Sequence, residues 1–387
     1  MTQSSAHSLT LKLGTLNYRS LAKKATPQTR SSFIRHLRSL SFDILALQET
    51  HADNPDIQNI LHTQFQAKDS IWSAHCGLIC LSPDIELSAP FISRCGRLIH
   101  TSVTHRSNLF DSFTLTVVYF PANSGERLSF LSSEVMDTFF PSAPSRQVIL
   151  GDFNYSYANH FPSMPRRAPQ TWLEYIDRFF VDAITLVGQL ALPTFQNHRG
   201  TSCIDYGFVT KDMLSSILYS YNQVDFLPIE WTDHRLLSLN LRLRSSSSHT
   251  SSASSIGKGF WKAHPRLAKD STFQAKLNAC LSTTIASFPS DLPASLKWEH
   301  LKQVTAKTAR SYSRRQAFTL SRAEALLQRK RSKIESNLLC NPSLYPELSP
   351  QLKVVQEQLS SLQHYHVETL ALKAGIRWCE KGVLSAG

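Results

Sequence analysis

The first 244 residues alternate short apolar runs with stretches of helical spacing. The apolar runs are rich in Val, Ile, Leu and Phe, which favour β-strands. They predict strands at Leu9–Leu16, Ile44–Leu47, Gly77–Leu81, Thr114–Phe120, Gln147–Leu150, Cys203–Val209 and Leu236–Leu243. Periodicity predicts helices at Thr29–Ser39, Arg127–Phe140 and Thr171–Ile184. This mixture predicts an α/β domain whose sheets are covered by helices.

A Ser-rich run at residues 245–255, SSSSHTSSASS, marks a change in pattern. Such a run cannot build a core, so it predicts a flexible linker. We therefore expect an α/β domain over 1–244, a linker over 245–255 and a basic helical region over 256–387. Within that region Leu296–Leu339 and Gln351–Lys381 predict two long helices, separated by the breaker CNPSLYPELSP. An antiparallel helical hairpin is the simplest arrangement.

The net charge of +12 is spread unevenly along the chain. Residues 1–255 carry a net charge of +1, and residues 256–387 carry +11. Such asymmetry predicts a polyanionic partner, most simply DNA, although a solvated basic helix face has the same composition. The candidate phosphate contacts are Arg314, Arg315, Arg329, Lys330 and Arg331.

The composition also predicts where in the cell the protein is located. The seven cysteines are scattered and form no C-x-x-C pair, which indicates reduced thiols inside a cell. No apolar stretch is long enough to cross a membrane, so we expect no membrane partner. The run QRKRSK at residues 328–333 matches a nuclear-import pattern and predicts a nuclear location.

Five short polar motifs follow one another along the α/β region, each beside a predicted strand. They are LNYRS with Asn17, LQET with Glu49, GDFN with Asp152 and Asn154, CIDYG with Asp205, and TDHR with Asp233 and His234. Together they supply carboxylates, amides and one imidazole. These groups suit metal-assisted attack of water on a phosphodiester.

The motifs differ in the role that their chemistry suggests. Glu49 ends a buried strand and suits a hard cation such as Mg²⁺, with Mn²⁺ as the alternative ion. Asp152 and Asn154 project to the same side if the strand geometry continues, so one can activate water while the other donates to phosphate. The alternative for this motif is a plain turn, since Gly, Asp and Asn favour turns.

Three further residues complete the predicted site. Asp205 is the predicted partner of His234, because a carboxylate on one imidazole nitrogen leaves the other as a cationic donor to phosphate. Tyr119 closes the strand LTVVY and can present its hydroxyl to phosphate, or it is a core tyrosine. Arg199, in the loop QNHRGTSC, is a candidate minor-groove contact.

The motif order N…QET…YxP…GDFN…ID…DH resembles the endonuclease/exonuclease/phosphatase superfamily over about residues 9–243. The resemblance implies a four-layer α/β/β/α sandwich with its site at one edge of the paired sheets. It implies metal-site roles for Asn17, Glu49 and Asp233, and a water-activating role for Asp152. It further implies phosphate contacts for Tyr119, Asn154 and His234, with Asp205 as the histidine partner.

Within the superfamily, TLNYRSL, QETH and YFPANSGERLSF are similar to endonuclease domains of LINE-type (non-LTR) retrotransposons. The segment GKGFWKAHPRLAKDSTF is similar to the connector that precedes reverse transcriptase in such elements. No polymerase sequence follows, so we expect a truncated or split element-derived reading frame. Element RNA or a separate reverse transcriptase is then a conceivable partner.

Three functions remain open at this point. The first is a Mg²⁺-dependent DNA-nicking endonuclease that leaves a 3′-hydroxyl. The second is a phosphatase or other phosphodiesterase of the same fold. The third is an inactive element fragment that binds nucleic acid through its basic region.

Overall fold

The computed structural model describes residues 9–19, 27–132, 139–157, 168–186, 188–197, 200–220, 223–245 and 263–382. The chain forms two compact units, Met1–Ala253 with Gln328–Gln363, and Ser254–Leu327 with His364–Gly387. Part of the predicted helical region therefore groups with the α/β part. The limits 1–244, 245–255 and 256–387 stay a prediction, and nearly all of the Ser-rich run lies outside the described residues.

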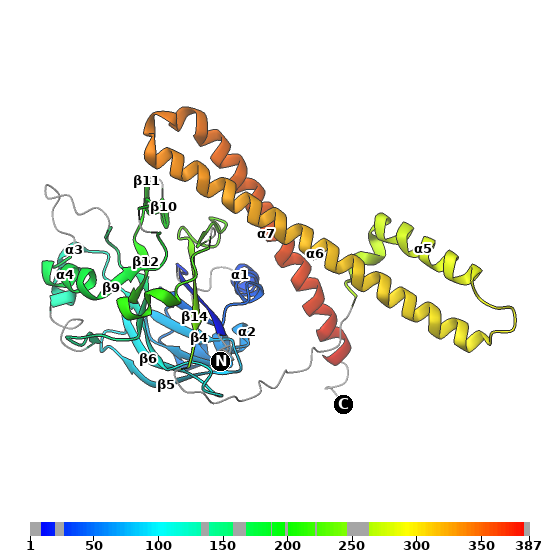
Figure 1. Ribbon diagram of the computed structural model, residues 1–387, viewed down its shortest axis with the longest axis horizontal. Coiled ribbons are helices and arrows are strands. Elements are labelled where there is room, and N and C mark those ends of the chain that lie inside the picture. Colours follow the sequence, from blue (N-terminus) through cyan, green and yellow to red (C-terminus); the bar gives the residue numbers. More distant parts are fainter. Residues whose placement is uncertain are drawn as a thin grey trace, which may run out of the picture. The chain divides into compact units, whose positions relative to one another are not determined.

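Two six-stranded mixed sheets build the first unit (Figure 1). The strands of one sheet are β1 (Leu9–Asn17), β2 (Ile44–Gln48), β3 (Asp69–Trp72), β4 (Cys76–Cys80), β13 (Val224–Asp225) and β14 (Leu236–Leu243). The strands of the other are β5 (Ile85–Ile92), β6 (Leu98–His105), β7 (Phe113–Tyr119), β8 (Gln147–Asp152), β9 (Phe180–Asp182) and β12 (Asp205–Thr210).

The order of strands is β13-β14-β1-β2-β4-β3 in the first sheet and β5-β6-β7-β8-β12-β9 in the second. The pairs β1–β2 and β7–β8 are parallel, and the other described pairs within these sheets are antiparallel. Both parallel pairs lie near the middle of their sheets. Each delivers the carboxyl ends of two adjacent strands to one edge, where sites are commonly built.

The main core lies between the two sheets. Leu13 of β1 and Ala46 of β2 share one buried cluster with Val117 of β7 and Leu150 of β8. Burying a side chain of the size of leucine contributes roughly 1.5–3 kcal/mol. This shared cluster is what fixes the two sheets face to face.

Helices cover the outer faces of both sheets. They are α1 (Pro27–Ser39), α2 (Pro55–Phe65), α3 (Ser124–Phe130) and α4 (Gln170–Phe179). Figure 1 shows α1 and α2 beside the first sheet and α3 and α4 beside the second. An aromatic cluster with Trp172, Phe153 and Phe208 packs α4 on the second sheet. The predicted α/β/β/α sandwich is confirmed.

The helix predicted at Thr171–Ile184 is too long. The helix α4 ends at Phe179, and the chain continues as β9, where Val181 pairs with Val209 of β12. Residues of β9 therefore form strand hydrogen bonds with β12, and not the helical hydrogen bonds that the apolar spacing predicted. The helix predicted at Arg127–Phe140 begins earlier, at Ser124, because the Asn123 side chain accepts from two backbone N–H groups. Its residues 133–138 lie outside the described residues.

Besides short 3-10 turns, the described residues contain a short hairpin and three further helices. They are β10 (Phe195–Asn197), β11 (Gly200–Ser202), α5 (Ser271–Ala286), α6 (Ala294–Cys340) and α7 (Tyr345–Gly382). The two long helices are the pair predicted on either side of the Pro-containing breaker. Among the helices in the described ranges, none has the length and apolar character needed to cross a bilayer.

Residues 328–363, the end of α6 and the start of α7, belong to the first unit and are called the hairpin tip below. Gln328 accepts from the backbone N–H of Phe226 at 3.0 Å and donates to the Phe226 carbonyl at 3.0 Å. Gln363 donates to the same carbonyl at 3.0 Å. Both glutamines are buried, so these bonds hold the strand end that leads into the TDHR motif.

Beside them lies a buried group of three charges. Arg331 Nη2 lies 3.0 Å from Glu335 Oε2, and Arg235 Nη2 lies 4.0 Å from Glu335 Oε1. One carboxylate thus faces two guanidinium groups. Burial and the nearby Arg331 charge lower the pKa of Arg235 to about 9, against the opposing effect of Glu335. This group is stable only while Glu335 keeps its charge.

The burial of Arg331 overturns its predicted role. We expected this residue to contact DNA phosphates, but it is fully buried and donates to the Val224 carbonyl at 3.2 Å. The basic run QRKRSK predicted an exposed face, and a helix necessarily turns some of its residues inward. Arg331 is therefore a structural cation in this arrangement.

Replacing Glu335 should destabilise the first unit. In Glu335→Gln, the two guanidinium groups lose their shared counter-charge while they stay buried. Removing one partner of a buried ion pair costs about 3–5 kcal/mol. We expect the urea midpoint to fall accordingly. Glu357→Gln, an exposed acid on the same hairpin tip, is the matched control and should leave the midpoint unchanged. Equal midpoints for the two variants would contradict the assignment.

Candidate active site

The register of the strands brings the predicted site residues to one edge of the sandwich. Asn17 ends β1, and Glu49 directly follows β2, its parallel neighbour. In the second sheet Tyr119 of β7 and Asp152 of β8 are register partners, and so are Asp152 and Asp205 of β12. Five strand ends from two sheets therefore present their polar residues together.

The backbone at this edge adopts uncommon conformations. Glu49 and Asn154 both have φ of +54°, the left-handed region that costs most side chains free energy. Gly151 has φ of +152°, and a β-carbon there would lie 1.9 Å from the Val118 carbonyl oxygen. Only glycine fits at that position. The GDFN motif therefore needs its glycine for the close approach of β7 and β8.

Asn17 lies at the centre of the hydrogen bonds. Its Nδ2 donates to Glu49 Oε1 at 3.1 Å and to Asp152 Oδ2 at 2.9 Å. An amide nitrogen carries two N–H donors, so both are used. The Asn17 amide thus links two carboxylates from different sheets. The Tyr119 hydroxyl donates to the same Glu49 oxygen at 3.0 Å.

Asp152 is buried, and its oxygens accept from several donors. The Asn154 backbone N–H donates to Oδ1 at 2.8 Å, and the Asn154 amide donates to Oδ2 at 3.2 Å. Burial and the nearby Asp205 charge raise the pKa of Asp152, whereas His234 and the hydrogen bonds lower it. The carboxylate is therefore held in a place where a proton or a cation would relieve its charge.

Asn154 and Tyr119 contact other residues of the site in this structure, and their predicted phosphate contacts stay a prediction. Asn154 Nδ2 donates to the Phe120 carbonyl at 2.9 Å as well as to Asp152. Both donors face the protein, so in this structure Asn154 orients Asp152. The Tyr119 hydroxyl likewise points at an acid, Glu49. Both residues lie in the site, and each contacts a carboxylate.

Asp205 and His234 form the predicted pair. His234 Nδ1 lies 3.0 Å and 2.9 Å from the two Asp205 oxygens, and both side chains are buried. Burial disfavours the imidazolium, but the Asp205 carboxylate outweighs it and raises the pKa of His234 to about 9. His234 is therefore cationic at neutral pH. Its Nε2 is left as a charged donor.

Two threonines that received no role from the sequence support this pair. Thr232 donates to the Asn17 carbonyl at 2.8 Å and accepts from the His234 N–H at 3.1 Å. Thr194 Oγ1 accepts from the Asp205 N–H at 3.0 Å. The position of Thr232 within TDHR was the signal that could have identified it. Thr194 lies in no motif, so only the fold reveals it.

Asp233 is the least integrated of the predicted metal-site residues. Its carboxylate lies 3.6 Å from Arg19 Nη1, and the Arg19 N–H donates to Asn17 Oδ1 at 2.9 Å. Arg19 thus links Asp233 to the end of β1. Glu49 and Asn17, by contrast, are in direct contact.

The carboxylates of the site suit a hard divalent cation. Glu49 and Asp152 offer the oxygen atoms that Mg²⁺ and Mn²⁺ prefer, and the Asn17 amide joins these two acids. Asp152, Asp205 and His234 bring ligand atoms within 4.8 Å of one another. His234 Nδ1 is already occupied by Asp205, which favours the oxygen set containing Glu49.

The predicted DNA contacts lie in different places. Arg329 and Lys330 are exposed on the hairpin tip, and Arg314 and Arg315 are exposed on α6 in the second unit. Arg331 is buried, as described above. Arg199 lies between β10 and β11, outside the described residues.

Several solved structures resemble the chain in fold. The endonuclease domain of TRAS1, a telomere-specific non-LTR retrotransposon, is 16% identical with a TM-score of 0.43, covering 61% of this chain and 99% of that chain. D. rerio TDP2 complexed with single-strand DNA product is 14% identical with a TM-score of 0.43, covering 60% and 98%. The human Nocturnin catalytic domain with bound sulfate is 14% identical with a TM-score of 0.40, covering 61% and 96%.

No curated protein matches the sequence. The profile of the endonuclease/exonuclease/phosphatase family, however, matches residues 14–254, well over half of the chain. That match contains all the residues from Asn17 to His234 that meet at the edge of the sandwich. The chain belongs to the endonuclease/exonuclease/phosphatase family.

Proposed function

We propose that this protein is a divalent-metal-dependent endonuclease that nicks DNA and leaves a 3′-hydroxyl. The observation that carries the proposal is the single hydrogen-bonded network of Glu49, Asn17 and Asp152, with the Asp205–His234 pair beside it. It combines oxygen ligands, a carboxylate able to accept a proton and a fixed cationic donor. Phosphodiester hydrolysis requires each of these.

The residues divide the chemistry among them. Glu49 and Asn17 would hold Mg²⁺ or Mn²⁺, with Asp233 at the periphery, and the bound cation would offset charge on the phosphate. Asp152 orients water and accepts its proton, and its raised pKa matches that task. The cationic His234 donates to a phosphate oxygen from Nε2, while Asp205 keeps the ring in position.

DNA as the substrate is supported by the charge distribution. Exposed Arg314, Arg315, Arg329 and Lys330 provide cations that can contact phosphates. The resemblance of the motifs to LINE-type elements suggests a retrotransposon origin, with element RNA or a separate reverse transcriptase as further partners. A nuclear location follows from the same proposal.

Nicking should require the metal and Glu49. We expect Mg²⁺ to convert supercoiled plasmid to open circles and EDTA to stop it. Glu49→Gln keeps the shape of the side chain but removes its charge, so the rate should fall about 10²-fold or more. Glu86→Gln, an exposed acid on β5, is the control and should nick normally. If a folded protein nicks no DNA but hydrolyses inositol phosphates, the phosphatase alternative replaces this proposal.

Replacing Asp152 or His234 should lower the rate of nicking far more than the affinity for DNA. We expect Asp152→Asn and His234→Ala each to lower single-turnover nicking by about 10²–10⁴-fold. Retention of labelled DNA on a filter should change little, because neither residue supplies the main phosphate contacts. His100→Ala, a partly buried histidine on β6, serves as the control. Wild-type rates in either variant would disprove the assigned roles.

The exposed arginines of α6 should contribute to the salt dependence of DNA binding. Each lost phosphate contact lowers the slope of log K against log salt concentration by about 0.9. Arg314→Ala with Arg315→Ala should therefore flatten the slope by about 1.8. Arg106→Ala, an exposed arginine directly after β6, is the control. An unchanged slope would show that these arginines form only a solvated helix face.

A further inference from the structure

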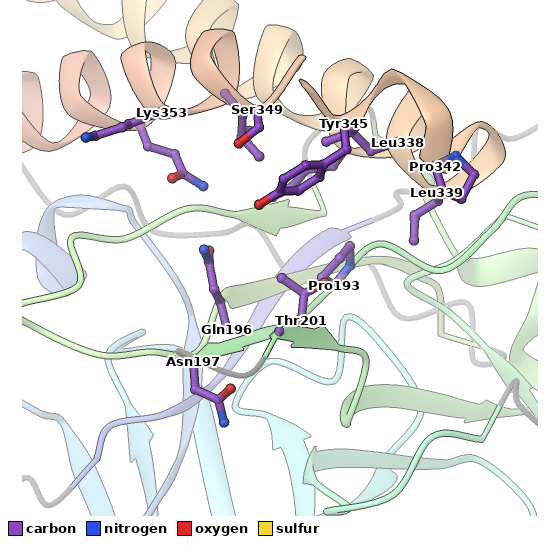
Figure 2. A pocket seen from close by; sticks show the side chains of 14 residues that line it. Pro193, Gln196, Asn197, Thr201, Leu338, Leu339, Pro342, Tyr345, Ser349 and Lys353 are labelled. Carbon is purple, nitrogen blue, oxygen red and sulfur yellow. The ribbon is translucent and has the colours of Figure 1, made fainter. Parts of the chain in front are cut away.

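A cavity of about 750 Å³ lies between the β10–β11 hairpin and the hairpin tip, within the first unit (Figure 2). Gln196 and Thr201 lie on one wall, and Leu338, Tyr345 and Lys353 lie on the other. The residues that line it do not include Glu49, Asp152 or His234. This cavity is therefore separate from the catalytic network.

The hairpin-tip wall is anchored by buried polar contacts. Gln328 and Gln363 bind the backbone of Phe226, and Arg331 binds the Val224 carbonyl. Glu335, which lines the cavity, is the counter-charge of Arg331. Buried polar contacts of this kind hold the elements that they join in a fixed arrangement. The cavity wall is thus anchored within the first unit.

The other wall is tied to the catalytic histidine. The Phe195 ring lies 4.8 Å from the His234 ring, between centroids. The next residue, Gln196, donates from its backbone N–H to the Asp233 carbonyl at 3.0 Å. Consecutive Cα atoms are about 3.8 Å apart, so the cavity wall begins one residue away from the contact with His234.

The lining offers an aromatic face, amide donors and one cation. Tyr345 is 64% exposed and projects toward Gln196 in Figure 2. Arg235 donates to Gln196 Oε1, which leaves the Gln196 amide nitrogen for another acceptor. On the hairpin-tip wall, Gln356 Nε2 is buried and has no hydrogen-bond partner among the described residues. Lys353 is exposed on the same wall.

We propose that this cavity binds one unpaired nucleotide of the DNA substrate, adjacent to the scissile phosphate. The base stacks on Tyr345, since stacking on aromatic side chains accommodates any base. The amide nitrogens of Gln196 and Gln356 donate to acceptors on the base edge, and Lys353 contacts the phosphate. This inference rests on the proposed DNA substrate.

The test uses the full chain carrying Glu49→Gln, so that DNA is bound but not cut. One probe is a duplex with a single unpaired 2-aminopurine, and the other is the continuous duplex. We expect tighter binding to the first probe, with quenching of its fluorescence by stacking. Adding Tyr345→Ala should weaken binding to that probe by about tenfold or more and abolish the quenching, with little effect on the duplex. Tyr345→Phe should keep both properties.

The matched control is Phe318→Ala, because Phe318 is an exposed aromatic of similar exposure, 66%, on α6 in the second unit. It should change neither probe. The inference is wrong if Tyr345→Ala binds both probes as its parent does, or weakens both equally. If the wild-type protein nicks plasmid but Tyr345→Ala gives either of these two results, the nuclease proposal stands and the nucleotide pocket is ruled out. If the parent binds neither probe and the wild-type protein nicks no plasmid, both proposals fail.

Discussion

The hydrogen bond from Asn17 to Asp152 is the interaction on which the site depends, because it joins the two sheets at their shared edge. Asn17 belongs to the sheet of β1, and Asp152 to the sheet of β8. The apolar cluster between the sheets fixes their packing, and only that packing places the amide within reach of both acids. The geometry of the site is thus a consequence of core packing.

Two neighbouring buried carboxylates cost free energy unless a cation lies beside them. Asp152 and Asp205 are adjacent in register and both buried, and the cation that faces them is His234. The imidazolium stabilises Asp205 directly, which leaves Asp152 with amide donors and a raised pKa. A divalent cation held through Glu49 would relieve that imbalance. The electrostatics of the network therefore favour the same ion that the oxygen donors favour.

The sequence predicted the site residues better than their hydrogen-bond partners. Each motif follows or begins a buried strand, and local periodicity is enough to place Glu49 or Asp152 at a strand end. Periodicity does not say which way a donor turns. Asn154 faces Asp152 and Phe120 because the β7–β8 pairing puts those acceptors there. Likewise, the burial of Arg331 depends on a glutamate one turn away and on the strand end at Val224, which no local pattern encodes.

The hairpin tip shows why the basic helical region is not simply an appended binding segment. Its glutamines hold Phe226, and the chain from Phe226 runs directly into Asp233 and His234. The same tip holds Arg235 through Glu335, and Arg235 in turn holds the side chain of Gln196, next to the residue that contacts His234. A disturbance of the tip would therefore reach both the loop of Asp233 and His234 and the β10–β11 hairpin. The hairpin tip is therefore a structural part of the first unit.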